Sequence, residues 1–477
     1  MSAGLDGEAA DLGSKALGLV LLHRLGLRVP PAFAVTAEAC RAFLHERRLP
    51  DGLHEELAEG VAGLERATGR TLGGPDRPLA VSVRSGAGVS MPGMLDTVLG
   101  LGLTTAATAA LAAETGDEGF AEDSRDRFLT SFTATVPGPV PDDAPTQLVR
   151  AVEAVFASWE SPRARTYRAL HGLPDGPGTA AVVQVMVFGN RDPRSGTGVA
   201  FSRDPVTGEH TPYGDVRFRA QGEDVVSGTR PVLPLRELAD HDDELWTELG
   251  DALRRVEAHY RDACYTEFTF ESGELWLLQV RPARFTGAAA VRTAVELAEA
   301  GTVDRREALR RVSPRDLARV PRIGSPRTVA ARGTGACPGV AVGRVVTTAE
   351  AAVREARRAP VVLVRPETSP ADLAGVAAAV GIVTERGGPA SHAAVVARAL
   401  RKPAVVGTGA LRLPEGTLVT VDGTTGEVAL GTPPIVTDPP GDHLRHLLAW
   451  ADEVSGDPAP RAEADRLTAA HRALGAV

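Results

Sequence analysis

Residues 384–398, TERGGPASHAAVVAR, constrain the fold of this chain more than any other stretch. The pair Gly387-Gly388 favours a turn that most side chains could not follow. Ser391 stands where a helix N-cap belongs, and His392 opens an alanine- and valine-rich helix. Backbone N–H groups point outward there and the helix dipole favours negative charge. An imidazole with an ordinary pKa of about 6.5 is mostly neutral at cellular pH, so His392 is suited to accept a phosphoryl group.

Length and composition set broad limits. A chain of 477 residues suits about three domains, and 43% hydrophobic residues are enough for packed cores. The net charge of −9 gives no reason to expect nucleic acid or an anionic membrane as a partner. Of the 52 basic residues only Lys15 and Lys402 are lysines, which hints that arginine would not serve at these two positions.

Cysteine usage and the absence of long apolar runs bear on location. Cys40, Cys264 and Cys337 are scattered without metal-ligand spacing, which suits a reducing compartment and argues against a disulfide framework. No run approaches the roughly 20 apolar residues that span a bilayer, and residues 1–10 lack an export pattern. We therefore expect a cytoplasmic protein without a membrane partner.

The pattern of apolar residues predicts a mixed α/β chain. We expect a helix, a short strand and a helix over residues 11–45, and a strand over 79–84 that leads into a loop at 85–93. Residues 104–170 are mainly helical. Strands follow at 181–188 and 198–202, and a hairpin at 265–280 turns at Ser272-Gly273. Residues 287–320 read as helix, 333–431 alternate strands with helices, and a helical tail begins at Asp442.

Several segments before residue 285 could bind the phosphoryl donor. Residues 195–198, SGTG, form a short glycine loop that could bring backbone N–H groups against phosphate. Arg84 at a strand end could clamp an anion. Glu267 and Gln279 lie on facing arms of the hairpin, and their oxygens suit Mg²⁺ that bridges phosphates. Each signal is weak alone: the loop is also a common hairpin turn, Arg84 could form a surface ion pair, and the carboxylate and amide could belong to an ordinary sheet face.

Together these segments resemble the pyruvate phosphate dikinase family. Residues 384–398, followed by 402–407, KPAVVG, are similar to the phosphohistidine domain of that family, and 365–370, RPETSP, also resembles it. Residues 81–87 and 90–99 are close to its arginine motif and phosphate-covering loop. Residues 184–190, 195–209 and 221–226 resemble its nucleotide-contacting segments, and 267–281 its metal-binding hairpin. The resemblance is nearly continuous from about residue 11 to 450, and it leaves little room for a histidine that merely caps a helix.

The resemblance implies an α/β (α+β) fold with three parts. These are an ATP-grasp domain at 1–285 with a helical subdomain at about 104–175, a helical linker at 286–330 and a β/β/α swivelling phosphohistidine domain at 331–435. A helical C-terminal tail at 436–477 follows. The implied ligands are ATP and Mg²⁺, with the β-phosphoryl of ATP ending on His392 as AMP is released. Lys15 and Arg84 would contact the triphosphate, Gly93 and Thr197 would hold its phosphates, and Glu267 and Gln279 would hold magnesium. The other implied ATP-binding residues are Gln184, Met186, Glu223 and Arg281.

Three departures from the family pattern stand out. Ala390 replaces a threonine two residues before His392, Tyr265 replaces an aspartate two residues before Glu267, and the glycine-rich lysine loop reads GSKALG at residues 13–18. The change at Tyr265 removes one carboxylate from the implied phosphate and metal site. These departures keep a second interpretation open, in which the chain is a non-catalytic, nucleotide-binding regulatory relic of a dikinase.

The dikinase resemblance also carries an expectation about the phosphoryl acceptor. Dikinases continue into a large barrel that binds pyruvate, and the 24 residues after Glu453 are too few for the roughly 250 of such a barrel. We therefore expect the acceptor to be a separate protein or a small molecule. The sequence leaves the final acceptor and the oligomeric state open, a homodimer included.

Overall fold

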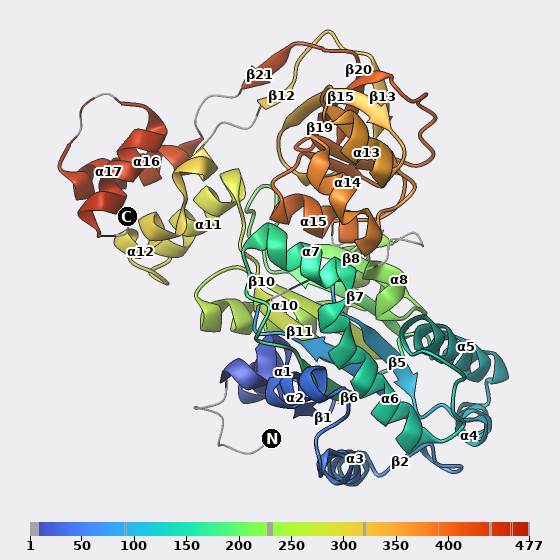
Figure 1. Cartoon of the computed structure of the whole chain (residues 1–477). Coiled ribbons are helices and arrows are strands. Elements are labelled where there is room, and N and C mark those ends of the chain that lie inside the picture. Colours follow the sequence, from blue (N-terminus) through green and yellow to red (C-terminus); the bar gives the residue numbers. More distant parts are fainter. Residues whose placement is uncertain are drawn as a thin grey trace. The chain divides into compact units, whose positions relative to one another are not determined.

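The computed structural model describes residues 9–89, 91, 93–226, 232–317, 321–389, 391–437, 441–457, 459 and 461–475 (Figure 1). The described chain is a mixed α/β protein, as the sequence predicts. It divides into two compact units. The first comprises the described residues up to Gly196 with residues 218–221 and 268–280, and the second comprises the other described residues.

A four-stranded antiparallel sheet forms the centre of the first unit, in the order β1-β6-β4-β5. The strands are Ala32–Val35 (β1), Val81–Gly86 (β4), Thr97–Leu101 (β5) and Ala180–Val185 (β6), with a short ribbon of Thr71–Leu72 (β2) and Pro78–Leu79 (β3). The helices are Ala9–Arg24 (α1), Ala37–Glu46 (α2), Leu53–Thr68 (α3), Thr105–Thr115 (α4), Glu118–Thr135 (α5), Ala144–Ala157 (α6), Ser158–Glu160 (η1) and Pro162–His171 (α7).

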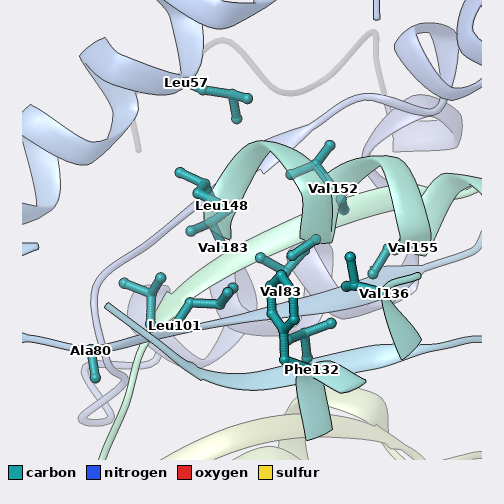
Figure 2. Close-up of a cluster of buried hydrophobic side chains, with 14 of the residues drawn as sticks. Leu57, Ala80, Val83, Leu101, Phe132, Val136, Leu148, Val152, Val155 and Val183 are labelled. Carbon is teal, nitrogen blue, oxygen red and sulfur yellow. The ribbon is translucent and has the colours of Figure 1, made fainter. Parts of the chain in front are cut away.

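The core of this unit lies between α6 and the sheet. Leu148, Val152 and Val155 recur at helical spacing and are at most 2% exposed, and Figure 2 shows them directed toward Val83 and Val183 of the sheet. Strands β4 and β6 are largely buried on both faces, and β6 is a nearly continuous apolar run, whereas β4 also carries Ser82, Arg84 and Ser85. The few polar side chains on these strands are therefore candidates for function.

A five-stranded sheet in the order β11-β10-β7-β8-β9 carries the predicted hairpin. Ser272 and Gly273 have φ of 53° and 85°, as a tight two-residue hairpin turn requires. The strands are Gly196–Phe201 (β7), Tyr213–Phe218 (β8), Leu233–Pro234 (β9), Cys264–Glu271 (β10) and Glu274–Pro282 (β11), and the helices are Gly222–Val226 (α8), Glu237–His241 (α9) and Asp243–Tyr260 (α10).

A helical cluster joins two segments that are far apart in sequence. Val295, Leu309, Leu447 and Leu467 are fully buried in one core, and Figure 1 shows their helices side by side. The elements are Gly287–Glu299 (α11), Arg305–Arg311 (α12), Pro314–Leu317 (η2), Asp442–Ser455 (α16) and Glu463–Ala473 (α17). The helical linker and the helical tail thus share one hydrophobic core, which their sequences considered separately did not predict.

An eight-stranded mixed sheet holds the conspicuous histidine, in the order β13-β20-β19-β15-β16-β17-β18-β14. Its strands are Val329–Arg332 (β13), Thr334–Cys337 (β14), Val340–Val346 (β15), Val361–Arg365 (β16), Gly381–Thr384 (β17), Ala404–Val406 (β18), Leu418–Asp422 (β19) and Glu427–Leu430 (β20). Its helices are Ala349–Glu355 (α13), Pro370–Asp372 (η3), Leu373–Ala378 (α14) and His392–Ala399 (α15), and Pro321–Ile323 (β12) pairs with Ile435–Thr437 (β21). Strands β15 to β18 run parallel, and buried valines form most of the core.

Two expectations about local structure were wrong. Gly196, Thr197 and Gly198 begin β7 instead of forming a loop, because the segment is paired between β10 and β8 in the five-stranded sheet. The helix expected over 287–320 breaks into α11, α12 and η2, because Gly301 takes a φ of 73° and Asp304 caps the next helix.

Two further features concern the apolar helices and the cysteines. None of the helices formed by described residues is both long and apolar enough to cross a membrane. The three cysteines are buried and unpaired, and burial raises the pKa of Cys40 and Cys337 to about 11 and that of Cys264 to about 12.

Candidate functional site

The loop that leads to His392 is shaped by its glycines. It leaves the end of β17, and Gly387 adopts a φ of 102°, which an L side chain rarely takes. A Cβ atom at Gly387 would also lie 2.9 Å from the Cβ of Ser391. Ser391 has the extended backbone of an N-cap, and α15 begins at His392 as the sequence predicts. Ala390, the first departure from the family pattern, lies outside the described residues.

The imidazole of His392 is buried and only partly satisfied. Its Nδ1 lies 3.3 Å from the hydroxyl oxygen of Thr368. Within the described part of the chain, its Nε2 and the neighbouring Oγ of Ser391 are buried without a hydrogen-bond partner. Burial lowers the pKa of His392 to about 4, opposed by the negative charge of Asp372, so the ring is neutral at physiological pH.

Thr368 belongs to a short loop that Asp372 organises. The carboxylate of Asp372 accepts hydrogen bonds from the backbone N–H of Ser369 at 2.8 Å and from its hydroxyl at 3.0 Å. Arg365 forms an ion pair with the same carboxylate at 3.4 Å. Thr368 is not among the predicted site residues, although it lies in the segment 365–370, which resembles a family motif.

The first unit brings three of the predicted ATP-binding and metal residues together around Arg84. The guanidinium donates to Oε1 of Gln184 at 3.4 Å, to Oε1 of Gln279 at 3.4 Å and to the backbone carbonyl of Leu278 at 3.3 Å. Gln184 is 2% exposed, and its amide nitrogen has no hydrogen-bond partner among the described residues. Segments about 100 and 195 residues from Arg84 thus meet at one cation.

A close contact between two backbone segments places the loop that carries Lys15 beside the end of β4. Gly13 has a φ of 74°, and a Cβ there would lie 1.5 Å from the carbonyl oxygen of Gly86 at the end of β4. Ser14 donates from both its N–H and its hydroxyl to the carbonyl of Ala87, at 3.1 and 3.0 Å. The altered lysine loop therefore keeps the one glycine that its contact with β4 requires.

Two further predicted residues of this unit have less specific settings. Met186 is partly buried against the apolar core, and its N–H donates to the carbonyl of Ala80 at 2.9 Å. Gly93 is exposed and has a φ of 70°, and its neighbours Ser90 and Pro92 lie outside the described residues.

The remaining predicted residues lie in the region of the five-stranded sheet. Thr197 is buried near the start of β7, and Glu223 is half-buried in the short helix α8. Glu267 lies on β10, and Gln279 and Arg281 lie on the neighbouring strand β11. The guanidinium of Arg281 stands 4.3 Å from the ring centroid of Tyr265. The aspartate of the family pattern is thus replaced by an aromatic residue that stacks under a predicted ATP-binding arginine.

Glu267 and Gln279 carry oxygen donors of the types that Mg²⁺ takes. They supply a carboxylate and an amide oxygen from adjacent strands, and Mg²⁺ usually takes one or two protein oxygens with phosphate and water completing its shell. Among the described residues, no cluster of three or more His, Cys, Asp or Glu side chains could hold a metal by itself.

Comparison with known proteins decides the family. The model of the pyruvate phosphate dikinase AMP/ATP-binding domain matches residues 9–70 and 48–234, and that of the PEP-utilising enzyme mobile domain matches residues 358–426. A pyruvate, phosphate dikinase of Rhizobium meliloti is 38% identical over 94% of this chain. Pyruvate, phosphate dikinase 1 of Oryza sativa subsp. japonica and pyruvate, phosphate dikinase 2 of Zea mays are each 41% identical over 93% of it. The chain belongs to the pyruvate phosphate dikinase family.

The chain spans 59%, 54% and 58% of the lengths of these three dikinases. His392 lies inside the matched mobile domain, whereas the hairpin with Glu267, Gln279 and Arg281 lies outside both matched ranges. The hairpin assignment therefore rests on the sequence motif and on the contacts around Arg84.

Proposed function

We propose that this chain is an ATP-dependent phosphotransferase in which His392 carries the phosphoryl group. The observation that carries the proposal is the state of the imidazole, which is neutral, engaged at Nδ1 by Thr368 and unpartnered at Nε2 beside the unpartnered hydroxyl of Ser391. Buried polar atoms are almost always hydrogen-bonded, so two unsatisfied atoms on adjacent residues at a helix N-terminus suggest a place for an anionic group.

The tautomer that donates Nδ1–H to Thr368 leaves the lone pair on Nε2. In the proposed reaction this lone pair attacks the β-phosphorus of ATP, the bond to the α-phosphate oxygen breaks, and AMP leaves. Inorganic phosphate then takes the γ-phosphoryl as pyrophosphate, so that one phosphoryl remains on His392. The Nδ1 proton stays on the ring, where Thr368 accepts its hydrogen bond.

On the donor side, Arg84 and Lys15 would stabilise the charge of the triphosphate. Arg84 offers a planar fork, whose contacts with Gln184 and Gln279 hold it in one orientation before the nucleotide binds. Glu267 and Gln279 would hold Mg²⁺, which would neutralise phosphate charge. Gly93, Thr197, Glu223, Met186 and Arg281 complete the proposed ATP site.

Transfer also requires the nucleophile to be uncovered. Because Nε2 is buried in this structure, the atoms that cover it must move before a phosphorus atom can reach it. After transfer, we propose that His392 passes its group to a separate acceptor, either a pyruvate-binding partner or a small molecule. A cytoplasmic location and Mg²⁺ dependence are part of the same proposal.

The test is incubation with β-³²P-labelled ATP, Mg²⁺ and phosphate. Acid-labile, base-stable label should appear on the wild-type chain and should be absent from His392→Ala, while the affinity for ATP stays within about twofold because the change leaves the Arg84 network intact. His471→Ala is the matched control, since His471 is also buried but belongs to the helical cluster. Label that persists in His392→Ala would refute the assignment.

A regulatory relic is the second candidate, and Tyr265 is the observation that favours it. The aromatic ring replaces a carboxylate and packs against Arg281, so the site has one acidic metal ligand fewer than the family pattern. A relic would bind ATP without forming AMP at any Mg²⁺ concentration. AMP release or exchange of label between AMP and ATP by the purified chain would exclude it.

A further inference from the structure

A column of four side chains runs through the second unit from the nucleotide-side hairpin to α15. Arg281 stands 4.3 Å from the ring of Tyr265, and the rings of Tyr265 and Phe201 are 5.0 Å apart. The guanidinium of Arg398, on α15, stands 5.7 Å from the ring of Phe201. Both distances from cation to ring are within the range of a favourable cation–π interaction.

Arg398 connects this column directly to the loop of His392. Its guanidinium donates to the carbonyl of Pro389 at 2.7 Å and to the carbonyl of Ala336 at 3.0 Å. Burial lowers the pKa of Arg398 to about 10, so it stays cationic at neutral pH. A shift of Arg398 relative to Phe201 would therefore pull on the backbone three residues before His392.

A second contact ties the same loop to the same sheet. A Cβ at Gly388 would lie 2.4 and 2.5 Å from the two carboxylate oxygens of Asp215, a buried residue of β8. Strands β8 and β7 are neighbours, and Tyr213 of β8 packs with Phe201 in one apolar cluster. Because side chains alternate along a strand, Asp215 lies on the face of Tyr213.

The face of the sheet that carries the column is the face of the proposed metal ligands. Tyr265 and Glu267 are two residues apart on β10, and Gln279 and Arg281 are two residues apart on β11, so each pair shares a face. The stacking of Tyr265 on Arg281 places both pairs on one side of the hairpin. An α15 that rests on this column is therefore held over the face where the donor would bind.

We propose that Phe201 and Tyr265 form an aromatic seat for Arg398 that positions the His392 loop over the nucleotide-binding face of the sheet. In this chain Tyr265, the residue that departs from the family pattern, takes a docking role in place of a metal-binding one. These are positioning residues, because they act through Arg398 and do not touch the reacting atoms. The labelling test of this seat depends on the proposed function, because it measures transfer of the phosphoryl group to His392. The distance test does not.

The first test measures transfer at saturating ATP. Phe201→Leu and Tyr265→Leu should each lower the rate of His392 labelling by about tenfold, as expected for the loss of a desolvated cation–π contact. Phe201→Leu leaves the contact between Tyr265 and Arg281 in place, so it should not change the Kd for ATP more than about twofold. Tyr265→Phe and Phe201→Trp keep the ring and should stay within about twofold of wild type. Phe270→Leu, in the same hairpin but on the opposite face, is the matched control and should also label normally.

The second test does not depend on chemistry. Spin labels at Ala399→Cys and Thr207→Cys, both exposed positions, report the distance between α15 and the nucleotide-side sheet. The native cysteines are buried and should not interfere. The wild-type background should give a narrow distance distribution that broadens in Tyr265→Leu and is restored in Tyr265→Phe. If the distance distribution is unchanged in both Tyr265→Leu and Phe201→Leu, the aromatic seat is refuted, even if His392 is labelled. If the distribution broadens in these variants but the wild-type chain is never labelled, the proposed function is refuted and the aromatic seat is supported.

Discussion

The Arg84 region and the His392 region hold their polar groups in opposite ways. Among the described residues, Arg84 already donates hydrogen bonds to Gln184, to Gln279 and to a backbone carbonyl. His392 is engaged at one nitrogen only, and its other nitrogen and the hydroxyl of Ser391 are buried without partners among the described residues. Under the proposed function, Arg84 is a preorganised clamp for phosphate charge, whereas the polar atoms around His392 become satisfied only when a phosphoryl group is added.

This comparison predicts that the clamp fails more severely than the carrier when one contact is removed. Arg84→Met should lower His392 labelling by about 100-fold or more, because a fixed cation at developing charge has no substitute. Arg84→Lys should recover only part of the rate, since an ammonium cannot reproduce the fork. Single-turnover labelling measures both. Arg28→Met is the matched control, because Arg28 is an exposed arginine of the same unit that stacks on Trp276. A wild-type rate in Arg84→Met would remove the clamp from the account.

At His392, the hydrogen bond between Nδ1 and the hydroxyl of Thr368 can be removed without changing other contacts of the ring. Thr368→Val keeps the shape of the side chain and should slow labelling by about tenfold, because the ring loses the partner that selects its tautomer. Thr368→Ser keeps the hydroxyl and should remain within about threefold of wild type. If Thr368→Val and Thr368→Ser label equally well, the hydroxyl has no role in positioning the ring.

The close contact between Gly13 and the backbone of Gly86 allows a test of whether the position of Lys15 matters for ATP binding. Gly13→Ala would force a Cβ into the carbonyl of Gly86, so it should displace Lys15 and weaken ATP binding by several-fold. Gly116→Ala is matched in φ, at 67°, but an added Cβ there meets nothing within 4 Å, so it should cost only about 1 kcal/mol of stability and no ATP affinity. Calorimetric titration with ATP separates the two outcomes, and equal affinities would contradict the placement of Lys15.

The smallest effect concerns pH. The pKa of His392 is lowered to about 4, so the labelling rate should change less than about twofold between pH 8 and pH 6, where an ordinary histidine would titrate. Between about pH 6.5 and 4 the unfolded chain takes up a proton that the folded site refuses, so stability should fall as pH falls, by up to about 1.4 kcal/mol per pH unit. His392→Gln should lack this component in urea unfolding. A break in the rate near pH 6.5 would show that the imidazole is not desolvated during transfer.

Features that depend on local backbone conformation could be predicted from the sequence, whereas contacts between distant segments could not. Motifs with strong local chemistry, such as the Gly387-Gly388 turn, the helix start at His392 and the Ser272-Gly273 hairpin, are visible in the residues because backbone conformation requires them. The family resemblance predicts that Arg84, Gln184 and Gln279 belong to one ATP site, but the hydrogen bonds between them could not be derived from spacing. Their roles, like the predicted domain boundaries, stay predictions.

Tertiary proximity accounts for what the sequence did not reveal. Thr368 is an unremarkable threonine until the loop that Asp372 organises brings it to His392. The shared core of α11, α12, α16 and α17 joins segments more than 100 residues apart, and each of them alone reads only as an amphipathic helix. Tyr265 is a visible departure from the family pattern, but its packing between Arg281 and Phe201 depends on the tertiary fold and could not be predicted from the sequence.

The central claim is that His392 accepts the phosphoryl group on Nε2 because Thr368 occupies Nδ1. Phosphorus NMR of the chain denatured at alkaline pH after incubation with ATP, Mg²⁺ and phosphate distinguishes the two isomers of phosphohistidine. The account predicts a single signal from the Nε2 isomer, absent in His392→Ala. A signal from the Nδ1 isomer, or phosphorylation of another residue, would contradict it.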